Sequence, residues 1–159
     1  MTRLAARLQS SAGMNTGDPE WLPRLSSRTP DAPMTIVEVM TRAPHTIGRD
    51  QKLARAFAVM HQHSLRHLPV LDGGQLVGVL SQRDLYFVES LGGTDEIVDK
   101  VAEAMASDVY QVAPGELVAD VARTMAKHKY GCAVVVDRGQ VVGIFTATDA
   151  LALLADAMS

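Results

Sequence analysis

The chain has 159 residues, which is enough for one domain of ordinary size with a core of its own. Hydrophobic residues make up 47% and charged residues 21%, so a wholly disordered chain is excluded. The formal net charge of −3 argues against a protein that binds the phosphate backbone of nucleic acid, because such proteins usually carry a basic face.

Residues 1–33 differ from the rest of the chain. They are rich in turn-forming Ser, Gly and Pro and show no sustained apolar period. We expect a flexible N-terminal tail with a short helix at 4–8, in which Trp21 and Leu22 are the side chains suited to dock on the folded part. Because the tail has no apolar face to bury, its removal is expected to leave a folded module.

The remainder of the chain is duplicated. Shifted by 65 positions, residues 38–84 match the later sequence without a gap and give 12 identical pairs, where chance would give about 3 or 4. The identical pairs are Glu38/Glu103, Met40/Met105, Ala54/Ala119, Met60/Met125, His63/His128, Val70/Val135, Asp72/Asp137, Gly74/Gly139, Gln75/Gln140, Val77/Val142, Gly78/Gly143 and Asp84/Asp149. We therefore expect a first repeat at 34–92 and a second at 97–155.

The first repeat begins with helical patterns. Thr35 and Glu38 form a capping-box pattern that predicts a short helix toward Met40. A short extended piece is expected at 44–47, followed by a helix that Asp50 caps. One apolar stripe marks this helix, made of Leu53, Ala56, Phe57 and Met60.

A hairpin and a final helix complete the first repeat. Strands are predicted at 68–71 and 76–80, joined by a glycine turn at 72–74. Ser81 is the expected N-cap of a helix that continues through Val88.

The second repeat predicts the same order of elements. A helix along Val118–Met125 is expected to stop at Gly131, before strands at 132–136 and 141–145. Thr146 is the expected N-cap of the last helix. Neither repeat, at about 50 residues, would bury enough surface to be stable alone.

Two copies of one motif carry a family resemblance. They are Gly78-Val-Leu-Ser81-Gln-Arg-Asp84 and Gly143-Ile-Phe-Thr146-Ala-Thr-Asp149, supported by Arg66-His67-Leu68-Pro69-Val70 and by Val39-Met40-Thr41. Over residues 34–155 the chain resembles a tandem pair of CBS domains, the Bateman module. The resemblance implies an α/β (α+β) fold of two pseudo-symmetric repeats, each a small sheet with packed helices.

The resemblance also implies a function. Related modules bind adenosine-containing ligands, such as AMP, ADP, ATP or S-adenosylmethionine, in two clefts between the repeats, and they regulate another protein. A carboxylate at a helix start can accept both ribose hydroxyls, and the free N–H groups of the first turn can donate to a phosphate. An arginine adds a charge-assisted phosphate contact.

The resemblance implies two unequal clefts. In the first, phosphate and ribose would be held by Ser81, Arg83, Asp84, Arg66 and His67, and adenine by Val112, Gly131, Cys132 and Ala133. The second, weaker cleft would use Thr46, Ile47, Thr146, Thr148 and Asp149. Because the equivalents of Arg66 and His67 in the second repeat are uncharged, we expect nucleotides to prefer the Asp84 cleft.

Simpler interpretations stay open for these residues. Asp84 and Asp149 are also favourable charges at helix N-termini without any ligand. Arg83, Arg66 and His67 also fit ordinary surface or strand positions. The glycines that begin the two motifs also fit a role in relieving crowding within a hairpin.

The sequence predicts neither a metal site nor a catalytic residue. His61 and His63 would point about 200° apart on a helix and could not share an ion there. The single cysteine, Cys132, excludes an intrachain disulfide and is expected to be a buried strand residue. No catalytic cofactor is expected.

Our interpretation is therefore a non-enzymatic, stand-alone regulatory module. The alternative is a structural dimerisation module whose clefts are unoccupied. We expect a cytoplasmic homodimer with an unidentified effector protein as partner and without nucleic-acid or membrane binding. The helix faces expected to meet in the dimer carry Ala56 and Met60, and Val121 and Met125.

Overall fold

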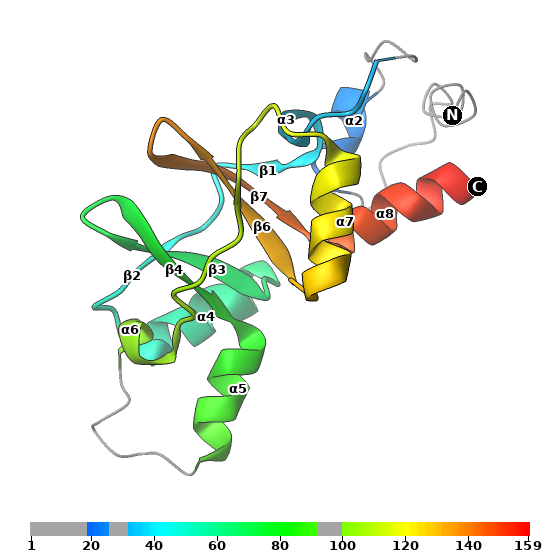
Figure 1. Ribbon diagram of the computed structural model, residues 1–159. Helices are drawn as coiled ribbons and strands as arrows, with labels where there is room; N and C mark the ends of the chain where they lie inside the picture. The colour runs from blue at the N-terminus through cyan, green and yellow to red at the C-terminus, as the bar shows by residue number, and fades with distance from the viewer. Residues whose placement is uncertain (1–18, 26–31, 92–99) are drawn as a thin grey trace. The chain divides into compact units, whose positions relative to one another are not determined.

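The structure is a computed structural model that describes residues 19–25, 32–91 and 100–159. The chain divides into two compact units, each with its own sheet and helices (Figure 1). Of the described residues, 43–91, 100–110 and 138–141 form the Asp84 unit, and 19–25, 32–42, 111–137 and 142–159 form the Asp149 unit. The mixed α/β architecture predicted from the sequence is confirmed.

The Asp84 unit is built on a three-stranded sheet of order β2-β3-β4. Strand β2 runs parallel to β3, and β3 pairs antiparallel with β4. Its elements are β2 (Ile47–Gly48), α4 (Leu53–His63), β3 (His67–Asp72), β4 (Gln75–Ser81), α5 (Gln82–Ser90) and α6 (Val101–Ala104). The predicted hairpin is confirmed, and its turn places Gly73 and Gly74 at φ values of 55° and 81°.

The Asp149 unit is built on a four-stranded sheet of order β1-β7-β6-β5. Strand β1 is antiparallel to β7, and β5 is parallel to β6. Its elements are α2 (Leu22–Leu25), α3 (Ile36–Val39), β1 (Thr41–Arg42), β5 (Gln111–Val112), α7 (Val118–His128), β6 (Cys132–Asp137), β7 (Gln140–Thr146) and α8 (Ala147–Met158).

Each unit takes its opening segment from the other repeat of the sequence. Strand β1 precedes the first hairpin in the chain, yet it pairs with β7 through Thr41 and Ile144. Helix α6 comes from the second repeat, yet the adjacent Ala106 forms a bridge with Val79 of β4. The compact units therefore do not coincide with the repeats.

This exchange explains the two motif glycines. A Cβ atom at Gly78 would lie 2.6 Å from the sulfur of Met105 and 2.9 Å from the carbonyl oxygen of Ala106. At Gly143 a Cβ atom would lie 2.9 Å from Cγ of Met40. Both glycines make room for a methionine from the exchanged segment, which supports the interpretation that they relieve crowding.

Three details of the local predictions are wrong. Helix α4 begins after Lys52, whose extended backbone makes it the N-cap, and not after Asp50. Helix α7 ends at Lys129, whose left-handed φ of 58° stops the helix before Gly131. The extended piece predicted at 44–47 is a strand at Ile47–Gly48, where the backbone pairs with β3. The capping box of Thr35 and Glu38 is confirmed at the start of α3.

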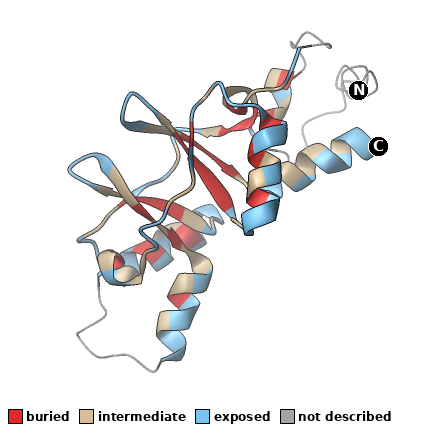
Figure 2. Cartoon of the chain, in the orientation of Figure 1, coloured by how far each residue is buried: buried red, intermediate tan, exposed pale blue. Residues whose placement is uncertain are grey.

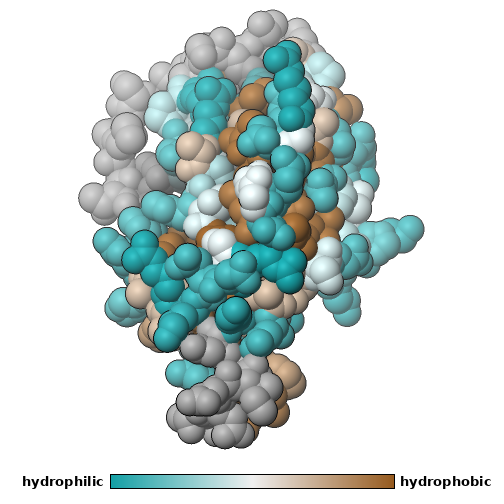
Figure 3. All heavy atoms as spheres, turned by 90° about the vertical axis from the view of Figure 1, so that its left-hand side faces the viewer, coloured by the Kyte–Doolittle hydropathy of each residue, from teal (hydrophilic) through white to brown (hydrophobic). Residues whose placement is uncertain are grey.

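Burial follows the strands. Figure 2 shows the buried residues along both sheets, and the core of the Asp84 unit includes Leu68, Val70 and Leu80. The surface in Figure 3 is mostly polar, with hydrophobic atoms visible between the polar side chains. Among the large apolar side chains, Tyr86 and Phe87 on α5 are exposed.

The faces predicted to meet in a dimer are buried within the single chain. Ala56 and Val121 are 0% exposed, and Met60 and Met125 are also buried. They pack beneath their helices and face the core, so they leave no apolar surface for a second copy. This argument for a dimer is therefore wrong.

The N-terminal region is described for residues 19–25, and the predicted helix at 4–8 lies outside the described residues. Trp21 is 0% exposed and Leu25 is also buried, whereas Leu22 is half-buried. The expectation that Trp21 docks on the folded part is confirmed. This part of the tail contributes a large buried side chain to the Asp149 unit.

Candidate functional site

In the Asp84 unit, a carboxylate is fixed at the start of α5. The hydroxyl of Ser81 accepts the backbone N–H of Asp84 at 3.1 Å, and Oδ2 of Asp84 accepts the N–H of Ser81 at 2.8 Å. This reciprocal pair is a capping box. Within residues 19–25, 32–91 and 100–159, no hydrogen bond reaches Oδ1 of Asp84. One oxygen of an oriented carboxylate is therefore free to accept a ligand hydroxyl.

Two arginines and a histidine lie near this carboxylate in the fold. The pairing of β3 with β4 sets His67 opposite Ser81, and the N–H of Gln82 donates to the carbonyl of Arg66 at 2.8 Å. Burial lowers the pKa of His67, the Asp84 carboxylate opposes this effect, and the charges of Arg66 and Arg83 lower the pKa further. The structure thus brings together the five predicted phosphate and ribose residues at one helix start.

The Asp149 unit repeats the capping box at the start of α8. Oδ2 of Asp149 accepts the N–H of Thr146 at 2.8 Å and its hydroxyl at 2.9 Å. The hydroxyl of Thr146 in turn accepts the N–H of Asp149 at 3.3 Å. The N–H of Ala147 donates to the carbonyl of Gly131 at 3.0 Å, as Gln82 does to Arg66 in the other unit. The two helix starts therefore share one backbone design.

The second carboxylate differs in its remaining oxygen. The indole N–H of Trp21 donates to Oδ1 of Asp149 at 3.2 Å. The sequence prediction missed this contact, because nothing local relates two residues 128 positions apart. The signal that could have suggested it is the presence of one Trp in an otherwise polar tail.

The residues predicted to contact adenine in the first cleft belong to the Asp149 unit. Val112 pairs with Val135 between β5 and β6, and Cys132 and Ala133 begin β6. Gly131 is exposed, and the other three are buried. Thr46 and Ile47, which were predicted for the second cleft, belong to the Asp84 unit, where Thr46 is exposed and Ile47 is buried. Thr148, predicted for the same cleft, is exposed on α8.

Cys132 is buried at the start of β6. Burial raises the pKa of its thiol to about 12, so the thiolate that a nucleophile or metal ligand requires is scarce near neutral pH. Among the described residues, no group of three His, Cys, Asp or Glu side chains is placed to hold a metal ion. His63 stacks on His45, with ring centroids 3.9 Å apart.

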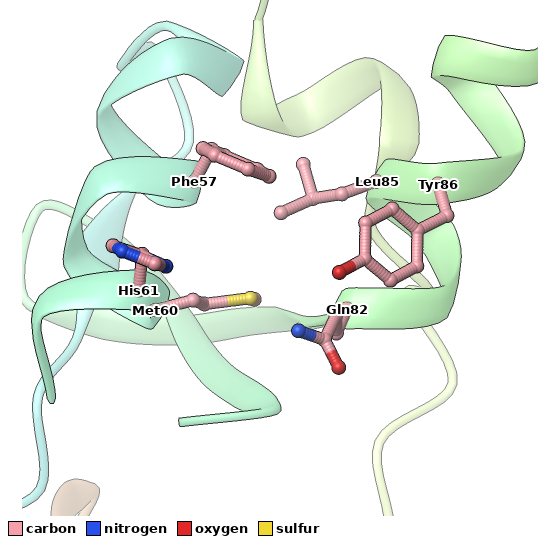
Figure 4. Close-up of a pocket in the computed structure, with 6 residues that line it drawn as sticks. All are labelled: Phe57, Met60, His61, Gln82, Leu85 and Tyr86. Carbon is pink, nitrogen blue, oxygen red and sulfur yellow. The ribbon is translucent and has the colours of Figure 1, made fainter. Parts of the chain in front are cut away.

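A small pocket lies between α4 and α5. Figure 4 shows Phe57 and Met60 on α4 pointing toward Leu85 on α5, with Gln82 and Tyr86 at the edge. Its volume of about 40 Å³ compares with the roughly 300 Å³ or more of typical ligand pockets. The pocket is too small for a nucleotide and is a gap between two helices.

Comparison with known proteins identifies the family of this chain. The family model of the CBS domain matches residues 36–89 and 101–156. The chain belongs to the CBS domain family. The resemblance seen in the sequence is confirmed, and the chain carries two CBS repeats.

Known relatives include both separate CBS proteins and larger enzymes. The CBS domain-containing protein YhcV of Bacillus subtilis is 28% identical over 115 residues, which cover 72% of this chain and 81% of YhcV. An inosine-5'-monophosphate dehydrogenase of Korarchaeum cryptofilum is 30% identical over 105 residues, 65% of this chain but only 21% of that enzyme. The likeness to the enzyme is thus confined to a small part of it.

Solved structures share the fold. A putative acetoin utilization protein, AcuB, from Vibrio cholerae has a TM-score of 0.71 and 32% identity, covering 80% of this chain and 94% of that chain. The CBS domain pair of protein MJ0100, solved in complex with 5'-methylthioadenosine and S-adenosyl-L-methionine, has a TM-score of 0.70 and 26% identity, covering 76% and 99%. In the parts of this CBS pair that the structure describes, no helix has the length and apolarity to cross a bilayer.

Proposed function

We propose that this CBS pair is a regulatory module that binds an adenine nucleotide at the start of α5. The observation that carries the proposal is the Asp84 carboxylate, which is oriented by Ser81 and keeps Oδ1 open near Arg66, His67 and Arg83. Oδ1 would accept the ribose hydroxyls, and Arg66, His67 and Arg83 would face the phosphates. Carboxylates bind hydroxyl donors and guanidinium groups bind phosphates with charge-assisted hydrogen bonds.

Comparison with the MJ0100 pair supports the ligand class. That pair was solved with two adenosine compounds, 5'-methylthioadenosine and S-adenosyl-L-methionine. For this chain we favour a ligand with phosphates, because the side chains at the start of α5 supply positive charge. Val112, Gly131, Cys132 and Ala133 are proposed to contact the adenine, and Thr46, Ile47, Thr146, Thr148 and Asp149 are proposed to form a second, weaker site.

We propose that the module acts by binding and not by catalysis. It aligns with 81% of YhcV and 94% of the Vibrio protein, but with only about a fifth of the matched dehydrogenase. A cytoplasmic effector protein would then respond to the ligand-bound state. No catalytic cofactor is part of this proposal.

The experiment is isothermal titration calorimetry with AMP, ATP, S-adenosylmethionine and adenosine, with thermal unfolding as a second readout. A ligand at 100 times its dissociation constant should stabilise the chain by about 2.7 kcal/mol. GTP serves as the control, since it has the phosphates but not the adenine. Binding of none of the adenine compounds, or of GTP equally well, would contradict the proposal.

A structural dimerisation module remains the second candidate, and exposed apolar side chains favour self-association. In the Asp84 unit, Phe57 is 45% exposed, Tyr86 51% and Phe87 63%. In the Asp149 unit, Leu151 is 64% exposed and Leu154 53%. We propose that the exposed side chains of the Asp84 unit, Phe57, Tyr86 and Phe87, are covered in a homodimer, since a two-fold contact buries the same patch on both copies. Light scattering at tens of micromolar tests this, with Tyr86→Glu expected to give a monomer.

A further inference from the structure

The N-terminal segment holds the carboxylate of the second repeat. Trp21 is 0% exposed, and its indole N–H donates to Oδ1 of Asp149 at 3.2 Å. Oδ2 of Asp149 is already engaged by the backbone and hydroxyl of Thr146. Both oxygens of this carboxylate therefore have partners within the chain, and a large aromatic ring fills the space beside it.

Two further contacts hold the segment in place on either side of the tryptophan. Oε1 of Glu20 accepts the backbone N–H of Arg42 in β1 at 3.0 Å. The guanidinium of Arg24 in α2 donates to the carbonyl oxygen of Met40. Residues 20, 21 and 24 thus contact β1, the residue before it and α8, all within the Asp149 unit.

Trp21 and Leu25 supply the buried apolar part of the packing, whereas the polar contacts of the segment can be exchanged for others. The Glu20 contact is exposed to solvent, and the Trp21 contact is one hydrogen bond to a half-buried carboxylate. A ribose offers hydroxyl donors to the same oxygen. The indole and a ribose would therefore compete for Oδ1, because both need the same acceptor atom.

We propose that residues 19–25 are an intramolecular plug that closes the Asp149 site, so that the chain binds one adenosine ligand until the plug is displaced. The proposal rests on the function proposed above for the identity of the ligand. Because Gly131 and Cys132 stand where the first repeat has Arg66 and His67, the ligand that enters here is an uncharged nucleoside. Adenosine is the probe for this site.

Calorimetry with adenosine on the full chain tests the plug. The wild type is expected to bind one adenosine per chain and Trp21→Ala two. One site per chain in both proteins would overturn the plug while leaving binding at Asp84 intact. Two sites in the wild type would also overturn it. No adenosine binding by either protein would overturn the proposed function and the plug together.

A second variant keeps the test decisive if Trp21→Ala does not fold. Glu20→Ala removes an exposed contact of the segment and leaves the tryptophan in place. Trp21 is the chain's one tryptophan, so its fluorescence reports the plug alone. In Glu20→Ala, adenosine should shift the emission toward that of water-exposed tryptophan at a concentration at least about tenfold lower than in the wild type. An emission that adenosine leaves unchanged in both proteins would overturn the plug.

The contact between Trp21 and Asp149 can also be tested without a ligand, by the quenching of tryptophan fluorescence. Asp149→Asn should raise the quenching of Trp21 by acrylamide, whereas Asp84→Asn, the matched change in the other repeat, should not. Equal quenching in the two variants, or a wild-type tryptophan as accessible as free tryptophan, would show that the segment does not close the site.

Discussion

The starts of α5 and α8 have the same backbone and different surroundings. Each has a hydroxyl N-cap and an aspartate three residues later, joined by reciprocal hydrogen bonds. Asp84 keeps one oxygen open near two arginines and His67, whereas Asp149 gives that oxygen to Trp21. A motif repeated in sequence therefore fixes the local geometry of a site, while residues outside the motif decide which copy is available.

The largest expected effect separates the two aspartates. Asp84→Asn should reduce AMP affinity by about 100-fold or more, because the charge that strengthens the ribose hydrogen bonds is lost. Asp149→Asn, the same change in the same capping box, should alter AMP affinity by less than about threefold. Both variants should lose stability, about 0.5–2 kcal/mol for the weakened helix cap, and Asp149→Asn should lose the more because it also weakens the contact with Trp21.

Calorimetry and urea unfolding of the two variants measure both quantities. Equal losses of AMP affinity would remove the distinction between the sites. A loss of affinity at Asp149 alone would reverse it.

The second effect concerns the phosphate. Arg83→Ala should weaken AMP and ATP binding by about 10- to 150-fold, which corresponds to one charge-assisted hydrogen bond, and leave adenosine affinity unchanged. Arg55→Ala, at an exposed position on α4, is the control for a general loss of charge. Calorimetry with the three ligands provides the comparison. An equal loss for adenosine and AMP would show that Arg83 does not face a phosphate.

The third effect compares the two repeats through the stability lost when Gly78 or Gly143 is replaced by alanine. Gly78→Ala and Gly143→Ala should each destabilise the chain by about 1–3 kcal/mol, as expected for overpacking. At Gly78 a Cβ would meet backbone as well as side chain, with the Ala106 oxygen 2.9 Å away, whereas at Gly143 the nearest backbone oxygen, of Thr41, is 3.1 Å away. Trimming the methionine should therefore relieve Gly143→Ala more than Gly78→Ala.

Double-mutant cycles with Met40→Ala and Met105→Ala measure this relief. The coupling energy should be larger for the Gly143 pair. Additive effects in both cycles would mean that the methionines do not limit these positions.

Features of the fold that depend on residues close together in the sequence could be predicted, and those that depend on distant residues could not. The capping box of Thr35 and Glu38, the N-caps Ser81 and Thr146 and the hairpins were predicted because each depends on residues a few positions apart. The end of α7 was misplaced because Lys129 adopts a left-handed φ that usually favours glycine. The exchange of β1 and α6 between repeats was not predicted, since a repeat in sequence does not say which copy a segment packs on.

The candidate site shows the same division. The phosphate and ribose residues of the first repeat were predicted from the family resemblance, and the pairing of β3 with β4 sets His67 opposite Ser81, where the chain continues into α5. The contact of Trp21 with Asp149 was not predicted, because it joins a tail to a helix start far along the chain. Its physical origin is burial of a large side chain, which local patterns do not specify.

The smallest expected effect compares the equivalent positions 67 and 132. Burial lowers the pKa of His67 in the folded chain, and the charges of Arg66 and Arg83 add to this while Asp84 opposes it. The folded state thus prefers the neutral imidazole.

At a pH above the pKa of His67 in the unfolded chain, His67 is neutral in both states and its contribution to stability is constant. As the pH falls through that value toward the pKa in the folded chain, the unfolded state takes up the proton first, so the free energy of unfolding declines. Urea unfolding from pH 7.5 to 5.5 should show this decline, and His67→Gln should flatten it relative to His61→Gln, a change at an exposed histidine on α4. At Cys132, burial raises the pKa to about 12, so Cys132→Ser should leave the slope over this range unchanged. An identical slope in the wild type and His67→Gln would show that the first repeat does not hold a neutral histidine poised for an anionic ligand.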